Sequence, residues 1–160
     1  MPGREQKFFL RKWIVSRALF YLPKAILSYM RLYTGIISRN GRMPIKRAFE
    51  NFEKLGMEDF DLIITRNDPI TPKPSDDGIN FAAIRLKIKP EEILIVGDYV
   101  YDIESGNRAG AITVFLRNEG APAAFNIESD FQISRLLELE NIVRLGLPPS
   151  SGNGSDLSVT

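Results

Sequence analysis

The chain contains neither cysteine nor histidine among its 160 residues. Without cysteine it can form no disulfide, no thiolate metal site and no catalytic thiol. Without histidine it lacks the commonest general base and the imidazole ligands found in most zinc sites. Any catalysis by this sequence must therefore depend on carboxylates, hydroxyl groups, lysine, arginine and a bound metal ion.

Long hydrophobic runs are also absent. The best apolar stretch, residues 13–22, contains Arg17 and ends before Pro23, whereas a membrane-spanning helix needs roughly 18–20 apolar residues. Arg17 and the lack of a clear small-residue cleavage site also argue against a secretory signal peptide. We therefore expect a cytoplasmic protein, with an organelle transit peptide as the alternative interpretation of the arginine-rich start.

Charge is distributed unevenly along the chain, although the net charge is only +1. Residues 1–35 contain seven basic side chains and one acid, Glu5, whereas the remainder contains 14 basic and 19 acidic groups. A basic, aromatic-rich segment of this kind can contact an anionic membrane or a partner protein. The alternative is a helix that packs against the rest of the protein.

We divide the chain into a basic helical segment at residues 1–33, a core domain at residues 34–147, and a tail at residues 148–160. The tail is rich in serine, glycine and proline, a composition typical of disorder. Within the first segment we expect helices at 7–22 and 24–33, with a short strand at 13–15 as an alternative.

Short apolar runs alternate with helical patterns through the core domain, which predicts a parallel sheet with helices on both faces. We therefore expect a three-layer, Rossmann-like α/β fold with an atypical N-terminal part. No glycine-rich dinucleotide fingerprint or P-loop occurs. The expected strands are 34–38, 61–65, 93–97, 111–116 and a weak one at 131–133, and the expected helices are 41–56, 77–87, 101–109 and 134–144.

The most informative stretch is residues 93–114, where a buried strand ends in Gly97-Asp98 and Asp102 follows four residues later. In open α/β sheets, ligands bind at the carboxyl ends of the strands. Two carboxylates at such an end are suited to a hard cation such as Mg²⁺. This pattern predicts a phosphate-handling enzyme.

Three stretches of the chain, in order, resemble three of the four motifs of the haloacid dehalogenase-like hydrolases, most closely the phosphoglycolate phosphatase-type members. They are residues 35–40 (GIISRN), Lys73 within residues 71–74 (TPKP), and Gly97-Asp98 with Asp102. The resemblance extends over about two-thirds of the chain. It implies a Mg²⁺-dependent phosphatase that acts on a small phosphorylated metabolite, with no nucleic-acid partner.

The resemblance also implies a role for each matching residue. Ser38 would hydrogen-bond the transferring phosphoryl group, with Arg39 and Asn40 beside it in the phosphate-binding set. Lys73 would neutralise phosphate charge. Ser38 and Asn40 could instead cap the following helix, and Lys73 could be an ordinary exposed lysine.

The fourth motif implies the metal ligands. Asp98 would coordinate Mg²⁺ directly, and Asp102 would either bind it through water or orient Lys73. The alternative for Asp98 is a helix cap. Together with Ser38 and Lys73, these two carboxylates make up the implied catalytic set.

The first motif of the family, which supplies the nucleophilic aspartate and a second aspartate, has no match. The first aspartate in the sequence is Asp59, and Ser16 stands where a nucleophile would follow the apolar residues 13–15. The gap from Ser16 to Ser38 is also short for a strand, a flap and a helix, and no cap domain fits there. Without the nucleophile no aspartyl-phosphate can form, and Mg²⁺ binding should weaken. We therefore expect an inactive or incomplete phosphatase, or alternatively a non-catalytic phosphate- and Mg²⁺-binding or interaction module.

Overall fold

The computed structural model describes residues 32–53, 55–117 and 128–145. The strands in these ranges are β1 (Gly35–Ile37), β2 (Leu62–Ile64), β3 (Leu94–Gly97), β4 (Ile112–Leu116) and β5 (Phe131–Ile133). The helices are α2 (Arg42–Phe49), α3 (Asp77–Leu86), α4 (Val100–Ala109) and α5 (Leu139–Leu145), and the short 3-10 turns are η2 (Met57–Asp59), η3 (Pro90–Glu92) and η4 (Leu136–Glu138). The helix expected at 7–22, nearly all of that at 24–33, and the tail at 148–160 lie outside the described residues.

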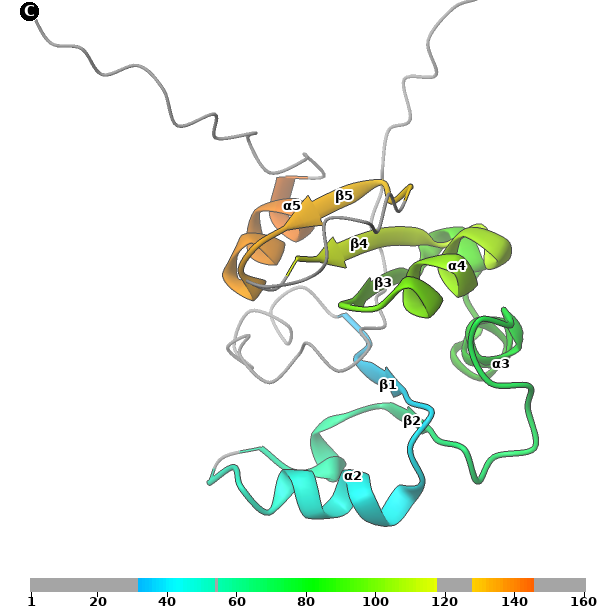
Figure 1. Ribbon diagram of the computed structural model, residues 1–160, viewed down its shortest axis with the longest axis vertical. Coiled ribbons are helices and arrows are strands. Elements are labelled where there is room, and N and C mark those ends of the chain that lie inside the picture. The colour runs from blue at the N-terminus through cyan, green and yellow to red at the C-terminus, as the bar shows by residue number, and fades with distance from the viewer. Residues whose placement is uncertain (1–31, 54, 118–127, 146–160) are drawn as a thin grey trace, which may run out of the picture.

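Every strand pair is parallel, so the predicted α/β fold class is confirmed (Figure 1). β1 pairs with β2 and places Ile36 opposite Ile63. β4 lies between β3 and β5, and its Val114 faces Val96 on one side and Phe131 on the other. The described strands therefore form two hydrogen-bonded groups, β1-β2 and β3-β4-β5.

Helices cover both faces of these strands, as strands rich in isoleucine, leucine and valine require. Helix α5 covers one face of β3-β4-β5, while α3 and α4 lie on the opposite side (Figure 1). Helix α2 packs Ile45 and Phe49 against Ile36 of β1. The core on the α5 side contains Leu94, Val96, Ile112, Val114, Ile133, Leu139, Ile142 and Val143.

Helix α3 joins the two groups of strands through a shared apolar core. Its buried residues Ile79, Ala82 and Ala83 belong to the same cluster as Ile37 and Ile64 from β1-β2 and Ile93 and Ile95 at β3. Burial of apolar surface is the main favourable term in folding. The packing of α3 therefore holds the ends of β1 and β3 at a fixed separation, which the site requires.

Helix α2 is shorter than the sequence predicted, because it ends at Phe49 and not near Gly56. The side-chain amide of Asn51 donates to the carbonyl oxygens of Arg47 and Ala48, both at 3.4 Å. Asparagine side chains that bond the backbone in this way compete with helix continuation. Phe52 and Leu55, which were expected on the helix, therefore lie beyond its end.

The start of α2 also differs from a simple capped helix. Gly41 occupies the capping position and has no side chain to cap with, so the Arg42 N–H donates to Oδ1 of Asn67, at 2.9 Å. A residue 25 positions away in sequence therefore satisfies one of the amide groups left open at the helix start. The helix expected at 134–144 is likewise divided, into η4 and α5.

A polar cluster around Thr113 fixes the start of β5 relative to β4. The Thr113 N–H and hydroxyl both lie within hydrogen-bond reach of Oδ2 of Asp130, at 2.8 and 2.9 Å, and the Asp130 N–H donates to the Thr113 hydroxyl, at 3.0 Å. The side-chain amide of Asn107 donates to the carbonyl oxygen of Glu128, at 2.8 Å. Thr113 is fully buried, so these bonds form in a low-dielectric environment where they are strong.

Among the helices of the described ranges, none combines the length and the apolar character that crossing a lipid bilayer requires.

Two glycines next to α4 have distinct roles. Gly97 ends β3 where a Cβ atom would lie 2.1 Å from Cβ of Asp102, so only glycine allows this approach. Gly110 adopts a φ of 75° at the C-terminal cap of α4 and has open space around it. Gly110 therefore ends the helix in the left-handed conformation that glycine favours.

We expect Gly97→Ala to destabilise the protein by about 1–3 kcal/mol, the usual cost of overpacking, because β3 and α4 must separate to admit the methyl group. Urea unfolding monitored by circular dichroism measures this change. Arg108→Ala, an exposed change on the same helix, is the control and should stay within about 0.5 kcal/mol. Equal stability of the Gly97 variant and the wild type would contradict the predicted clash.

Candidate functional site

A cavity of about 180 Å³ opens at the carboxyl ends of β1 and β3. All six residues that the sequence predicted for the site line this cavity. Its complete lining is Ile37, Ser38, Arg39, Asn40, Lys73, Asp98, Tyr99, Tyr101 and Asp102. Three segments far apart in the sequence therefore meet where parallel α/β sheets generally bind their ligands.

Lys73 forms the central polar contact of the cavity. Its ammonium group pairs with the carboxylate of Asp102, and both side chains are nearly buried, with 12% and 10% of their surfaces exposed. Nζ also donates to the carbonyl oxygen of Ile37, at 2.9 Å. Lys73 is therefore not an ordinary exposed lysine, and the geometry favours the second of the two roles expected for Asp102, that of orienting Lys73.

The loop that carries Lys73 is anchored at the start of α3. The Thr71 N–H donates to Oδ2 of Asp77, at 3.1 Å, and the Asp77 N–H donates to the hydroxyl of Ser75, at 3.2 Å. Hydrogen bonds from the Thr71 side chain, the Thr71 backbone and the Ser75 side chain, in that order, lower the pKa of the Asp77 carboxyl below its ordinary value. The ionised carboxylate therefore holds both ends of the lysine-bearing turn.

We expect Asp77 to add stability that depends on pH. Because the folded pKa lies below the unfolded pKa of about 3.9, this contribution is complete above that value and is lost as the pH falls through the folded pKa. The difference in unfolding free energy between wild type and Asp77→Asn should accordingly be present at pH 7 and vanish in strong acid. Urea titrations of both proteins across this range test it, and a constant difference would refute it.

Ser38 and Asn40 follow β1 and face the cavity without capping α2. The Asn40 N–H donates to the Ser38 hydroxyl oxygen, at 3.1 Å, and Gly41 holds the capping position. The capping explanation considered for Ser38 and Asn40 is therefore wrong for α2. Arg39, between them, is exposed and places its guanidinium carbon 5.2 Å from the centre of the Tyr101 ring.

Tyr99 and Tyr101 line the cavity but were not predicted from the sequence. They lie in the stretch GDYVYD between the two aspartates, with Tyr99 at the capping position of α4 and Tyr101 in its first turn. Their rings meet edge to face, with centroids 5.1 Å apart and an interplanar angle of 84°. The only available signal was the position of two aromatic residues beside Asp98 at a strand end.

Asp98 is exposed at the end of β3, lines the cavity, and fits a magnesium ion by the chemistry of its donors. Mg²⁺ commonly binds one or two carboxylates and completes its shell with water and substrate phosphate. Asp102 is engaged by Lys73, and the described part of the chain contains no group of three or more acidic residues placed for a metal. The residues therefore suit a metal held mainly by Asp98, water and a phosphate ligand.

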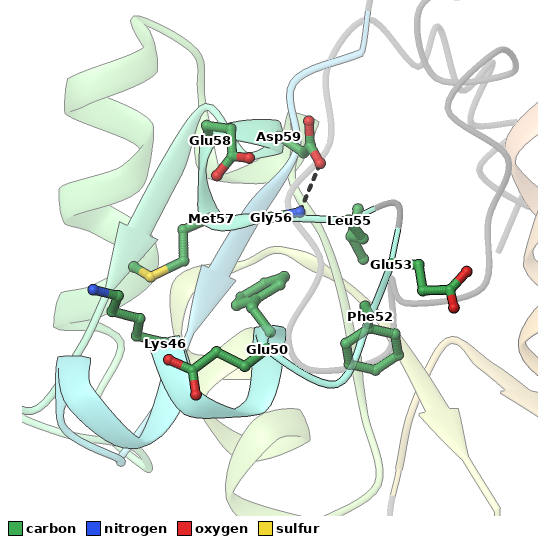
Figure 2. Close-up of a pocket in the computed structure, with 10 residues that line it drawn as sticks. Lys46, Glu50, Phe52, Glu53, Leu55, Gly56, Met57, Glu58 and Asp59 are labelled. Carbon is green, nitrogen blue, oxygen red and sulfur yellow. Dashed lines mark hydrogen bonds between the residues drawn. The ribbon is translucent and has the colours of Figure 1, made fainter.

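A second, larger cavity of about 550 Å³ lies between α2 and η2, away from all the predicted residues (Figure 2). Lys46 lies on α2 and Glu50 directly follows it, and Glu58 and Asp59 come from η2 on the other side (Figure 2). Oδ2 of Asp59 accepts from the Gly56 N–H, at 2.8 Å, which fixes the turn at its wall. No pattern in the sequence pointed to this cavity, because it depends on where α2 ends.

Residues 25–116 match the family model described as haloacid dehalogenase-like hydrolase. Over 84 residues the chain is 37% identical to an uncharacterized hydrolase, YOR131C, of Saccharomyces cerevisiae, covering 52% of this chain and 38% of the yeast protein. Over 109 residues it is 31% identical to the pyrophosphatase PpaX of Bacillus cereus, covering 66% and 49%. The chain thus spans less than half the length of these relatives.

Solved structures show the same fold. A predicted phosphoglycolate phosphatase from Haemophilus somnus superposes with a TM-score of 0.66 at 18% identity, covering 76% of this chain and 54% of that one. The HAD-hydrolase YfnB from Bacillus subtilis, in a magnesium-bound form, gives a TM-score of 0.63 at 22% identity, again covering 76% and 54%. The family match, the shared fold and the strand-end cavity agree, and the chain belongs to the haloacid dehalogenase-like hydrolases.

Proposed function

We propose that this chain carries the phosphate- and magnesium-binding part of a phosphatase site for small phosphate monoesters of the phosphoglycolate type. The observation that carries this proposal is the convergence of Ser38, Lys73, Asp98 and Asp102 on one cavity of about 180 Å³. Similarity to a pyrophosphatase and to a predicted phosphoglycolate phosphatase supports a small phosphate compound as the ligand.

Each residue contributes a defined property to phosphate binding. The Lys73 ammonium, fixed by Asp102 and the Ile37 carbonyl, neutralises negative charge on the phosphoryl oxygens. The Ser38 hydroxyl donates a hydrogen bond to the same group, and Arg39 and Asn40 add donors at the mouth. A magnesium ion, held by Asp98, would supply further charge neutralisation when bound.

Residues 1–58 contain no aspartate, since the first aspartate in the sequence is Asp59. We further propose that this part of the chain supplies no aspartyl nucleophile. Covalent phosphoryl transfer through an aspartate needs that carboxylate. Positioning and charge neutralisation, on which phosphoryl transfer also depends, would persist without it. We therefore expect the chain by itself to bind phosphate without hydrolysing a phosphate ester. The lack of an aspartate before Asp59 favours a non-catalytic binding module as the alternative function.

Titration of the chain with inorganic phosphate in the presence of Mg²⁺, followed by isothermal titration calorimetry, tests the site. We expect Lys73→Met to weaken binding about 10–100-fold, because a charge-assisted hydrogen bond contributes about 1.5–3 kcal/mol. The change leaves Asp102 buried without its cation, which by itself destabilises a protein by about 3–5 kcal/mol.

The double variant Lys73→Met/Asp102→Asn removes both charges and separates the two effects. It should recover much of the stability and still bind phosphate poorly. Wild-type affinity in either variant would overturn the assignment of Lys73. Phosphate release from p-nitrophenyl phosphate above the buffer rate would contradict the expectation that the chain binds without turnover.

The metal assignment is tested through the dependence of phosphate affinity on Mg²⁺. We expect wild-type affinity to rise several-fold as Mg²⁺ is added, and Asp98→Asn to lose this rise, because the amide removes the anionic ligand that a hard cation prefers. Glu91→Gln, an exposed change in η3, should behave as wild type. A Mg²⁺ dependence that survives Asp98→Asn would exclude Asp98 as the ligand.

A further inference from the structure

Three side chains in successive contact line the strand-end cavity, and we call this group the Arg39–Tyr101–Tyr99 stack. The guanidinium carbon of Arg39 lies 5.2 Å from the Tyr101 ring centroid, within the distance at which a cation is attracted to an aromatic face. The Tyr101 ring in turn meets the Tyr99 ring edge to face, at 5.1 Å. All three residues line the same cavity as Lys73 and Asp98.

Arg39 depends on this aromatic contact for its position. The Arg39 side chain is exposed. In the described part of the chain, the ion pair at the cavity joins Lys73 to Asp102, so it does not hold Arg39 in place. A free arginine side chain samples many rotamers, and fixing them costs free energy when a ligand binds. A ring that holds the guanidinium beforehand reduces that cost.

The stack also leaves the guanidinium able to bind an anion. A cation over an aromatic ring is held by its charge, whereas the N–H donors of a guanidinium lie in its plane and point outward from its edge. These donors match the paired oxygens of a phosphate or carboxylate. The arrangement therefore combines a positioned cation with outward-pointing donors at a cavity of about 180 Å³.

We propose that Tyr101, supported by Tyr99, is a positioning residue that holds Arg39 for oxyanion binding at this cavity. The proposal rests on the proposed phosphate-binding function and adds to it a residue outside the family-like motifs. Tyr101 acts through the face of its ring, so the phenol hydroxyl is not needed, and Arg39 contacts the anion directly.

The test is phosphate titration of the full chain and its variants by isothermal titration calorimetry. Tyr101→Leu removes the ring and should weaken phosphate binding about 2–5-fold, the range expected from an exposed cation–π contact. Tyr101→Phe keeps the ring face and should bind within 1.5-fold of wild type, as an approximate limit by the same reasoning. Tyr101→Met, with similar bulk and no ring, should behave like Tyr101→Leu, and it replaces that variant if Tyr101→Leu does not fold.

A double-mutant cycle shows whether Tyr101 acts through Arg39. In an Arg39→Ala background, Tyr101→Leu should cause no further loss of affinity. The matched control is Phe81→Leu on α3, because Arg85 lies 5.9 Å from the Phe81 ring in a similar contact that does not line the cavity. This control should leave phosphate affinity unchanged.

Three results would overturn the inference: equal losses in Tyr101→Phe and Tyr101→Leu, additive losses in the double variant, or unchanged affinity in Tyr101→Leu. Its failure is distinguishable from failure of the proposed function. If wild type binds phosphate in a Lys73-dependent manner and Tyr101→Leu has no effect, only the positioning role is wrong. If wild type does not bind phosphate at all, the proposed function fails and this inference fails with it.

Discussion

The ion pair between Lys73 and Asp102 is the contact on which the site depends. Lys73 comes from the loop before α3, Asp102 from the first turn of α4, and Ile37, whose carbonyl accepts a hydrogen bond from Nζ, from the end of β1. Nearly buried charges of this kind add little net stability, because desolvation offsets their attraction. The pair instead fixes three separate segments at one point and places the Lys73 cation at the wall of the strand-end cavity.

This contact in turn requires the close approach of β3 and α4. Gly97 lets the backbone at the end of β3 pass against Asp102, where any Cβ atom would overlap it. Asp102 lies in the first turn of α4, where the helix dipole favours a negative charge. Gly97 and Asp102 therefore have separate physical roles within one short stretch.

Much of this could be predicted from the sequence, because strands that are buried on both faces have a strong local signal. The strand runs ending near Ile37, Ile64, Gly97 and Leu116 agree with the structure to within a residue or two. Parallel strands place their carboxyl ends at one edge, so residues after β1 and β3 could be expected to meet. The prediction of which residues line the cavity followed from that geometry together with the family-like motifs.

What could not be predicted depends on contacts between distant residues. The Asn51 side chain sets the end of α2, and Asn67 sets its start. The helical spacing of Phe49, Phe52 and Leu55 predicts a longer helix, and neither asparagine is recognisable from the sequence as a residue that limits it. The stack of Arg39 on Tyr101 requires two motifs to be side by side in space. The cavity beside η2 arises only because α2 ends where it does.

The bonds around Thr113 have a consequence for how this fold can change during evolution. Asp130 hydrogen-bonds to Thr113 of β4, and Glu128 hydrogen-bonds to Asn107 of α4. These bonds fix the position at which the connection from β4 enters β5. The free energy of closing a loop grows slowly with its length, by about 0.6 kcal/mol for each doubling. A change in the number of residues between Arg117 and Glu128 therefore costs little in loop closure, while the bonds at Glu128 and Asp130 fix where β5 begins.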